Sequence, residues 1–83
     1  MSGNETVEET IKKIAEKILR RTDISFAPNT TFKDLGADSL DIVQIVAAVE
    51  DTFEIEMDDD ELQNVKDTSG FVTYVKSKIA EKR

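Results

Sequence analysis

The chain has no cysteine, no histidine and no tryptophan, and its 83 residues include only one proline and three glycines. Without cysteine and histidine it can form no disulfide, no thiolate nucleophile, no imidazole base and no Cys/His zinc site. Any acid–base or metal chemistry would have to use carboxylates, lysines and Tyr74. We therefore expect a protein that is not an enzyme and has no metal site.

Positive charge is also scarce, because 11 Lys and Arg face 18 Asp and Glu, for a net charge of −7. This balance argues against nucleic acid or anionic lipid as the main ligand, since both need a cationic surface, and it favours basic protein partners. The N-terminal stretch reads MSGNETVEET, and no apolar run resembles a signal peptide or reaches membrane-spanning length. We expect a cytoplasmic protein with no membrane insertion.

The residues that are present predict a single domain spanning residues 1–83, because 39% apolar side chains are enough for one small core. A first helix is predicted over residues 6–19. Thr6 and Glu9 are spaced as a capping box, and Arg20 and Arg21 suit the negative end of the helix dipole. Its apolar residues recur at steps of three and four, at Val7, Ile11, Ile14, Ile18 and Leu19.

Residues 22–37 lack periodicity and contain turn formers such as Pro28 and Gly36, so they predict a long loop. Connections of this length are uncommon inside a compact domain. We expect the loop to be ordered and held against the core by its four large apolar side chains, Ile24, Phe26, Phe32 and Leu35.

Three further helices are predicted. Residues 39–53 contain no Gly or Pro and follow Asp38, a favourable helix-starting residue; the acids from Asp58 onward favour a short helix. A last helix follows Asp67, with a basic end. Its apolar residues are Phe71, Val72, Val75 and Ile79. The pattern indicates an all-α fold, a small antiparallel helical bundle with three principal helices and one short one, expected to be a monomer.

The negative charge is concentrated in residues 34–61, which we call the acidic segment. It holds eleven acids and no Lys or Arg, whereas the rest of the chain has a net charge of +4. Such runs often serve only solubility. Its members are Asp34, Asp38, Asp41, Glu50, Asp51, Glu54, Glu56, Asp58, Asp59, Asp60 and Glu61.

The helix predicted over residues 39–53 has two apolar faces. One face, about 100° wide, is expected to contact the core and consists of Ile42, Ile45, Val46, Val49 and Phe53. The other, which we call the apolar patch, consists of Leu40, Val43 and Ala47, flanked by Glu50 and Asp51. Either loop residues such as Phe26 or Phe32 cover this patch, or it is a docking site for a basic partner.

The junction of the loop and this helix reads Gly36-Ala37-Asp38-Ser39-Leu40-Asp41 and resembles the signature of acyl carrier proteins. The likeness covers nearly the whole chain: a Thr-x-Phe-x-x-Leu-Gly-Ala-Asp-Ser-Leu-Asp run over residues 30–41, a helix ending in Glu-Asp-Thr-Phe, an acidic turn and a last helix with Tyr74. The resemblance implies that Ser39 is the attachment point of 4′-phosphopantetheine, installed by a phosphopantetheinyl transferase. The thiol of this arm would carry acyl groups as thioesters, as in fatty acid biosynthesis and lipid metabolism.

The residues around Ser39 agree with that implication. Ser39 has no histidine or adjacent lysine to take its proton, so it is a substrate and not a nucleophilic catalyst. A phosphate at a helix N-terminus would meet free backbone N–H groups. We expect acyl-transferring, condensing and reducing enzymes to dock with basic surfaces. The expected docking residues are Asp38, Leu40, Asp41, Val43, Ala47 and Asp51.

Departures from the usual carrier pattern concern the partners. Gln44 stands where many fatty-acid carriers have Glu, and Ala47 where a bulkier apolar residue is usual. These differences leave open a carrier dedicated to a polyketide or peptide pathway, or an unmodified acidic helical interaction module. A calcium-binding EF-hand is excluded by spacing, since a loop starting at Asp58 puts Gln63 at the required Gly position. A hydrolase with paired carboxylates is the weakest alternative, because so small a bundle leaves little room for a substrate pocket.

Overall fold

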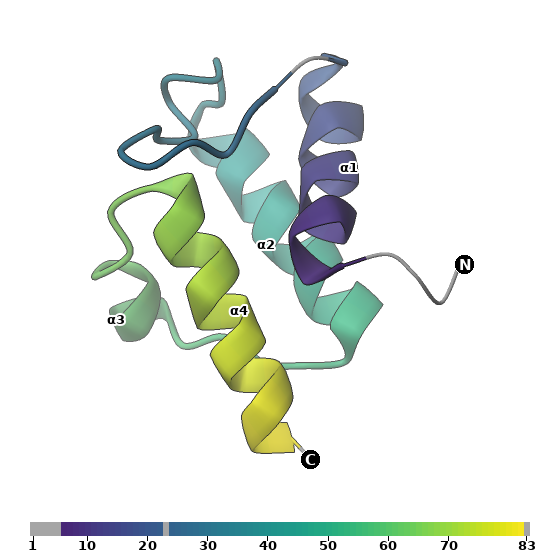
Figure 1. Cartoon of the computed structure of the whole chain (residues 1–83), viewed down its shortest axis with the longest axis vertical. Helices are drawn as coiled ribbons and strands as arrows, with labels where there is room; N and C mark the ends of the chain where they lie inside the picture. Colours follow the sequence, from purple (N-terminus) through teal and green to yellow (C-terminus); the bar gives the residue numbers. More distant parts are fainter. Residues whose placement is uncertain (1–5, 23, 83) are drawn as a thin grey trace.

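The computed structural model describes residues 6–22 and 24–82. In that part of the chain the secondary structure is four helices: α1 (Val7–Leu19), α2 (Ser39–Phe53), α3 (Asp59–Leu62) and α4 (Thr68–Lys82) (Figure 1). The all-α prediction, with three long helices, a short one and a long connection before α2, is confirmed. The first half of the polar N-terminal stretch, residues 1–5, and Arg83 at the basic end lie outside the described residues.

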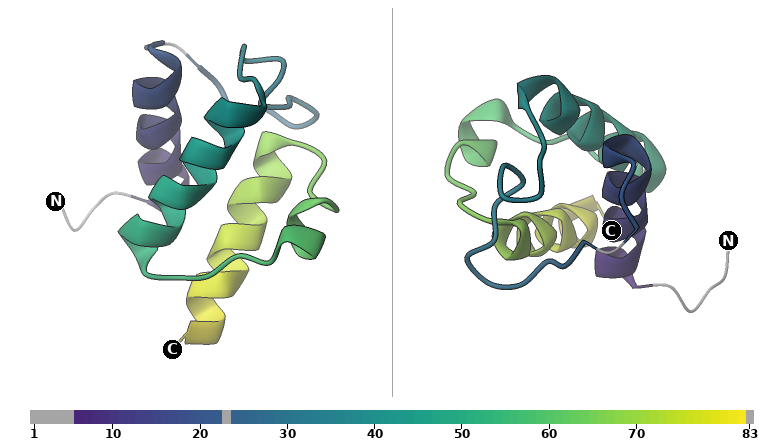
Figure 2. Two further views of the ribbon diagram at one scale, coloured as in Figure 1. Left: turned by 180° about the vertical axis from the view of Figure 1, so that it is seen from behind. Right: turned by 90° about the horizontal axis from the view of Figure 1, so that it is seen from above.

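The three long helices form the body of the bundle. α1 packs against both α2 and α4 and runs antiparallel to them (Figures 1 and 2). α2 and α4 run in similar directions. The reason is that residues 54–67, which connect the end of α2 to the start of α4, run back along the bundle and form α3 beside α4 (Figure 2). The N-terminus of α2, the C-terminus of α1 and the loop that joins them therefore lie at the same end of the molecule.

Local hydrogen bonds explain the helix boundaries. α1 begins with the predicted capping box of Thr6 and Glu9. It ends where Arg20 adopts a left-handed conformation (φ 59°) and the Arg21 amide donates to the Glu16 carbonyl. Glu54 ends α2 in the same way, with φ 56°. Neither end uses glycine, the residue that takes this conformation without a steric penalty.

The core confirms the role predicted for the loop. Ile24 and Phe26 are buried, and Leu35 packs against the core. The Phe32 ring lies edge-on between Phe26 and Phe71, with ring centroids 6.0 and 5.4 Å apart. An aromatic column thus joins the loop to α4. Such edge-to-face pairs add to the stabilisation from area burial alone.

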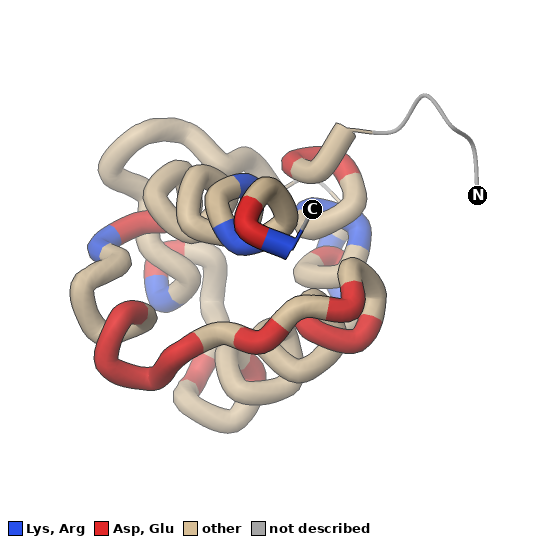
Figure 3. The backbone as a smooth tube through the Cα atoms, turned by 90° about the horizontal axis from the view of Figure 1, so that it is seen from below, with Lys and Arg blue, Asp and Glu red and all other residues tan. Residues whose placement is uncertain are grey.

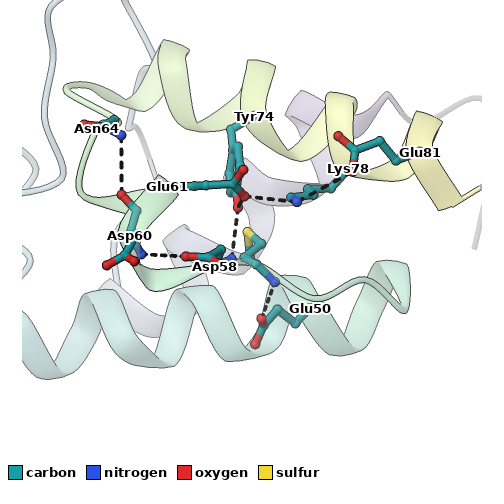
Figure 4. Close-up of polar contacts among 9 residues, drawn as sticks. Glu50, Asp58, Asp60, Glu61, Asn64, Tyr74, Lys78 and Glu81 are labelled. Carbon is teal, nitrogen blue, oxygen red and sulfur yellow. Dashed lines mark hydrogen bonds and ion pairs between the residues drawn. The ribbon is translucent and has the colours of Figure 1, made fainter.

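The segment between α2 and α3 contributes core residues that helical periodicity did not predict. Ile55 and Met57 are buried, although acids flank them on both sides. Their spacing of two is the alternation of an extended strand, so one face of this segment packs inward. The Met57 amide donates to Glu50 Oε2 at 2.7 Å, which fastens the segment to the last turn of α2 (Figure 4).

The long loop is also fastened to the start of α4. The Thr68 amide donates to the Thr30 carbonyl at 2.7 Å. The Asp67 carboxylate accepts from the amides of Asn29 (3.0 Å) and Gly70 (2.7 Å). Asp67 therefore caps α4 and holds the loop against it at the same time.

Candidate functional site

Ser39 is the first residue of α2, and its side chain is exposed. A hydrogen-bonded turn fixes the backbone before it: the Gly36 amide donates to Lys33 O (2.9 Å), and the Ala37 amide donates to Phe32 O (3.0 Å). Gly36 has φ 95°, which favours glycine, and Ala37 is only 6% exposed. Ser39 is thus accessible on a well-anchored backbone.

A second contact ties this turn to the end of α1. The Arg21 guanidinium donates through Nη1 to the Leu35 carbonyl at 3.2 Å. A Cβ atom added at Gly36 would lie 3.5 Å from the same Nη1, an ordinary van der Waals distance. Substitution of Gly36 is therefore disfavoured by its positive φ and not by lack of space.

Asp38 and Asp41 form a reciprocal capping box around Ser39. Asp38 Oδ1 accepts from the Asp41 amide at 2.9 Å, and Asp41 Oδ2 accepts from the Asp38 amide at 3.2 Å. Both carboxylates thus stabilise the start of α2. The helix-starting role predicted for Asp38 is confirmed, and the structure adds a reciprocal capping role for Asp41, for which the sequence predicted only recognition.

The first amides of α2 suit an anionic group. The amide N–H groups of Ser39 and Leu40 make no hydrogen bond within the described residues. They lie at the positive end of the helix dipole, where phosphate oxygens are favoured. A phosphodiester on Ser39 Oγ therefore fits the residues around it.

The two faces of α2 are arranged as the sequence predicts. Ile45 and Val49 are buried, and Val46 and Phe53 pack against the core. In the apolar patch, Leu40 is 64% exposed and Val43 is 62% exposed, and Ala47 is also exposed. The alternative in which Phe26 or Phe32 covers this patch is wrong, because both rings belong to the aromatic column.

One residue of the core-facing stripe differs from the prediction. Ile42 is only partly buried, and it lines a mainly apolar cavity of about 620 Å³ between α2, the loop and α3. The cavity is bounded by Thr31, Phe32, Lys33, Ile42, Ile45, Val46, Leu62, Gln63, Val65, Lys66, Asp67 and Phe71. Its volume falls in the range of small-ligand sites, roughly 300–1,000 Å³.

Helical geometry relates Ser39 to both faces of α2. At about 100° per residue, Ser39 lies about 20° from Val46, which lines the cavity, and about 40° from Val43 of the apolar patch. A group attached to Ser39 is therefore anchored at the border between the cavity and the exposed patch.

A polar cluster connects α3 to α4 (Figure 4). Tyr74 Oη donates to Glu61 Oε1 at 2.7 Å and accepts from the Asp58 amide at 3.0 Å, and Lys78 Nζ lies 3.0 Å from Glu61 Oε1. The hydrogen bonds from Tyr74 and Lys78 lower the pKa of Glu61. Burial and then the bond to Glu61 raise the pKa of Tyr74, and the bond to Glu61 raises that of Lys78.

Sequence reasoning missed this cluster. The available signal was a lone tyrosine among the aliphatic residues of the last helix, with Lys78 four residues later on the same helix face. The acidic partner comes from another helix, which periodicity within one helix cannot reveal.

Most acids of the acidic segment make no ion pair within residues 6–22 and 24–82, and Figure 3 shows them following one another from the end of α2 into α3. Its Glu61 pairs with Lys78 at 3.0 Å, and Glu54 pairs with Lys82 at 3.9 Å. Within residues 6–22 and 24–82, no group of three or more acidic side chains is placed to hold a metal ion, and no helix is long and apolar enough to cross a bilayer.

Comparison with known proteins identifies the family. Residues 9–75 match the family model described as "Phosphopantetheine attachment site". An acyl carrier protein of Nitratidesulfovibrio vulgaris is 39% identical over 74 residues, covering 88% of this chain and 97% of the relative. "Acyl carrier protein 3" of Ralstonia nicotianae is 38% identical over 81 residues, covering 96% and 93%.

The matched residues include the anchored turn, Ser39 and all of α2, and the relatives are covered almost from end to end. The family implies partner enzymes that include a phosphopantetheinyl transferase. Proteins of this family are modified by another enzyme and do not themselves catalyse a reaction. The exposure of Ser39 and the lack of histidine in the chain agree with this. The chain belongs to the acyl carrier protein family, whose members are non-catalytic carriers with a phosphopantetheine attachment site.

Proposed function

We propose that Ser39 carries 4′-phosphopantetheine and that the chain presents acyl thioesters on this arm to biosynthetic enzymes. The observation that carries the proposal is the exposed Ser39 at the start of α2, one helical turn before Ile42 in the cavity wall. The amides of Ser39 and Leu40 make no hydrogen bond within the described residues. The arm supplies the thiol that holds the acyl group. The transferase has to supply the base that takes the Ser39 proton, because the chain contains no histidine.

The cavity supports an aliphatic cargo. The side chains of Ile45, Leu62 and Phe71 in its wall offer an acyl chain an apolar environment, which is favoured by about 25 cal/mol per Å² of buried apolar surface. This observation favours fatty-acid biosynthesis, or a related pathway with alkyl intermediates, over a peptide pathway.

We further propose that residues 1–83 act as one domain and as a monomer.

The attachment site is tested by intact-mass measurement after coexpression with a phosphopantetheinyl transferase. We expect the wild type to gain the mass of one arm and peptide mapping to place it on Ser39. Ser39→Ala should gain no mass, while Ser77→Ala, a control on the exposed surface of α4, should be modified like the wild type. An arm found on Ser25, Ser69 or Ser77 would refute the assignment.

We also propose that partner enzymes dock on the apolar patch and on the acids beside it, Asp38, Asp41 and Asp51. Two large apolar side chains, Leu40 and Val43, are more than half exposed there. A small apolar centre with charged surroundings is typical of docking surfaces, where the charges mainly increase the association rate.

Docking is tested with Val43→Asp, which introduces an unpaired charge into the proposed contact. We expect at least a tenfold loss of transferase affinity at any salt concentration, with little change in melting temperature. Asp41→Asn keeps an oxygen that can accept the Asp38 amide, so it should slow association mainly at low salt. Ile45→Asp is the control for core damage. If Val43→Asp lowers the melting temperature as much as Ile45→Asp does, Val43 is not a surface residue.

A further inference from the structure

Two lysines, Lys33 and Lys66, line the cavity. Lys33 lies in the turn before α2, and Lys66 lies between α3 and α4. They are also the cations that flank the acidic segment in the sequence, so residues separated by that whole segment meet at one cavity. Their convergence comes from tertiary structure.

Hydrogen bonds between the loop and the start of α4 hold together the two segments that carry these lysines. Asn29 and Thr30 of the loop are bonded to Asp67 and Thr68, at 3.0 and 2.7 Å. Lys33 lies three residues after Thr30, and Lys66 lies one residue before Asp67. The segments that carry the lysines are thus fixed relative to each other.

In the part of the chain that the structure describes, neither lysine has an ionic partner, although the chain carries an excess of acids. Both side chains are exposed, and neither makes an ion pair or hydrogen bond within the described residues. The nearby acids have other roles: Asp67 accepts two backbone amides, and Asp34 accepts the Thr31 amide at 3.0 Å. The charge of the lysine pair is therefore available to a ligand.

We propose that Lys33 and Lys66 bind a carboxylate at the far end of the acyl cargo, so that this carrier favours dicarboxylic half-thioesters over simple fatty acyl groups. The inference rests on the proposed function, because it assumes a cargo anchored at Ser39. The methylene chain would lie in the cavity along Ile45 and Leu62, and the terminal carboxylate would meet the two ammonium groups in the cavity lining.

The first experiment compares cargoes of equal length. The holo carrier is loaded with hexanoyl or with adipoyl, which has six carbons and a terminal carboxylate, and the melting temperature of each form is measured. We expect adipoyl to raise the melting temperature about 2–5 °C more than hexanoyl, the size expected for partly exposed charge pairs in a domain of this length. The difference should shrink as salt is added.

The lysines are tested by the double variant Lys33→Gln and Lys66→Gln. In it, adipoyl should stabilise no more than hexanoyl, because the carboxylate would lose its partners. The matched control, Lys17→Gln with Lys76→Gln, removes the same charge from exposed positions outside the cavity and should retain the difference. Equal stabilisation by both cargoes in the wild type, or an equal effect of both variants, would overturn the proposal.

A second loading route separates this proposal from the modification of Ser39. Because the chain has no cysteine, Ser39→Cys can be joined to octanethiol or to 8-mercaptooctanoic acid by thiol–disulfide exchange with the symmetrical disulfide of each, which releases one thiol and needs no transferase or phosphate. We expect the chain with the carboxylate again to raise the melting temperature more than the chain without it. This difference should again disappear when Lys33 and Lys66 are replaced by Gln. If replacing Lys33 and Lys66 changes the melting temperature only of the holo form without cargo, the lysines bind the phosphodiester of the arm, and the carboxylate assignment is wrong.

Discussion

Ser39 shows how position can give an ordinary serine the attachment role that we propose for it. The chain has no histidine to activate its hydroxyl, and its distinguishing features come from neighbours: the buried Ala37 anchors the turn before it, and Asp38 and Asp41 close the capping box around it. These contacts fix the backbone while the side chain remains exposed. A modification site needs this combination, because a transferase must reach the oxygen and then release a stable product.

Thr68 carries the clearest energetic defect at the residue scale. It is fully buried, and its Oγ1 has no hydrogen-bond partner among the described residues. A buried unsatisfied hydroxyl costs about 1–3 kcal/mol. We predict that Thr68→Val, which keeps the shape and removes the hydroxyl, raises the free energy of unfolding by about 1 kcal/mol, measured by urea denaturation.

The matched control at this position is Thr68→Ser, which keeps the hydroxyl and removes the methyl group. It should lower the free energy of unfolding, because it leaves a void in the core. If Thr68→Val destabilises the protein as much as Thr68→Ser does, the hydroxyl has a favourable partner.

At the scale of elements, α3 is the least secured helix. It has only four residues, none of them buried, and it is held beside α4 by the Tyr74, Glu61 and Lys78 cluster together with the packing of Leu62. Because Leu62 and Gln63 also line the cavity, the attachment of α3 helps to define the cavity wall.

We predict that Tyr74→Phe, which removes the bonds to Glu61 and Asp58, lowers the free energy of unfolding by about 1 kcal/mol. The pKa of Glu61 should rise toward its ordinary value, measured by carboxyl NMR shifts on titration. The folded-state pKa of Glu61 is depressed, so its contribution is present above the unfolded-state value of about 4.3 and is lost as pH falls through the lower folded value.

In the same titration the Tyr74→Phe variant should lose less of its stability between pH 5 and about pH 3 than the wild type does. Lys76→Gln, an exposed position on α4 outside the cluster, should keep the wild-type profile. An unchanged Glu61 pKa in the Tyr74→Phe variant would mean that the hydrogen bond does not control it.

At the scale of the whole molecule, charge is distributed unevenly. Most acids of the acidic segment lack an ion-pair partner within residues 6–22 and 24–82, and they follow one another from the end of α2 into α3 (Figure 3). Their mutual repulsion opposes the compact state. Surface charges of this kind are also the easiest to screen, because the Debye length is about 8 Å at 0.15 M ionic strength.

We predict that sodium chloride raises the melting temperature by a few degrees and that magnesium chloride at equal ionic strength raises it further. Asp59→Asn, at an exposed position whose side chain makes no hydrogen bond in the described residues, should raise the melting temperature at low salt and lose this advantage at high salt. A melting temperature that stays flat or falls with added salt would show that repulsion does not limit stability.

The sequence by itself determined the local features. The spacing of apolar residues, the Thr6 cap and the Asp38–Ser39 junction predicted α1 and α2 almost to the residue, because periodicity and capping depend on near neighbours in the chain. The exposure of Leu40 and Val43 followed from the same angular reasoning.

Only the tertiary structure decided which distant residues meet. It brought Lys33 and Lys66 to one cavity, placed Tyr74 against Glu61, and buried Ile55 and Met57 within an acidic stretch. Each of these contacts depends on how residues 54–67 return along the bundle. Helical periodicity has no information about that path, because it is set by packing between elements and not by the residues within one element.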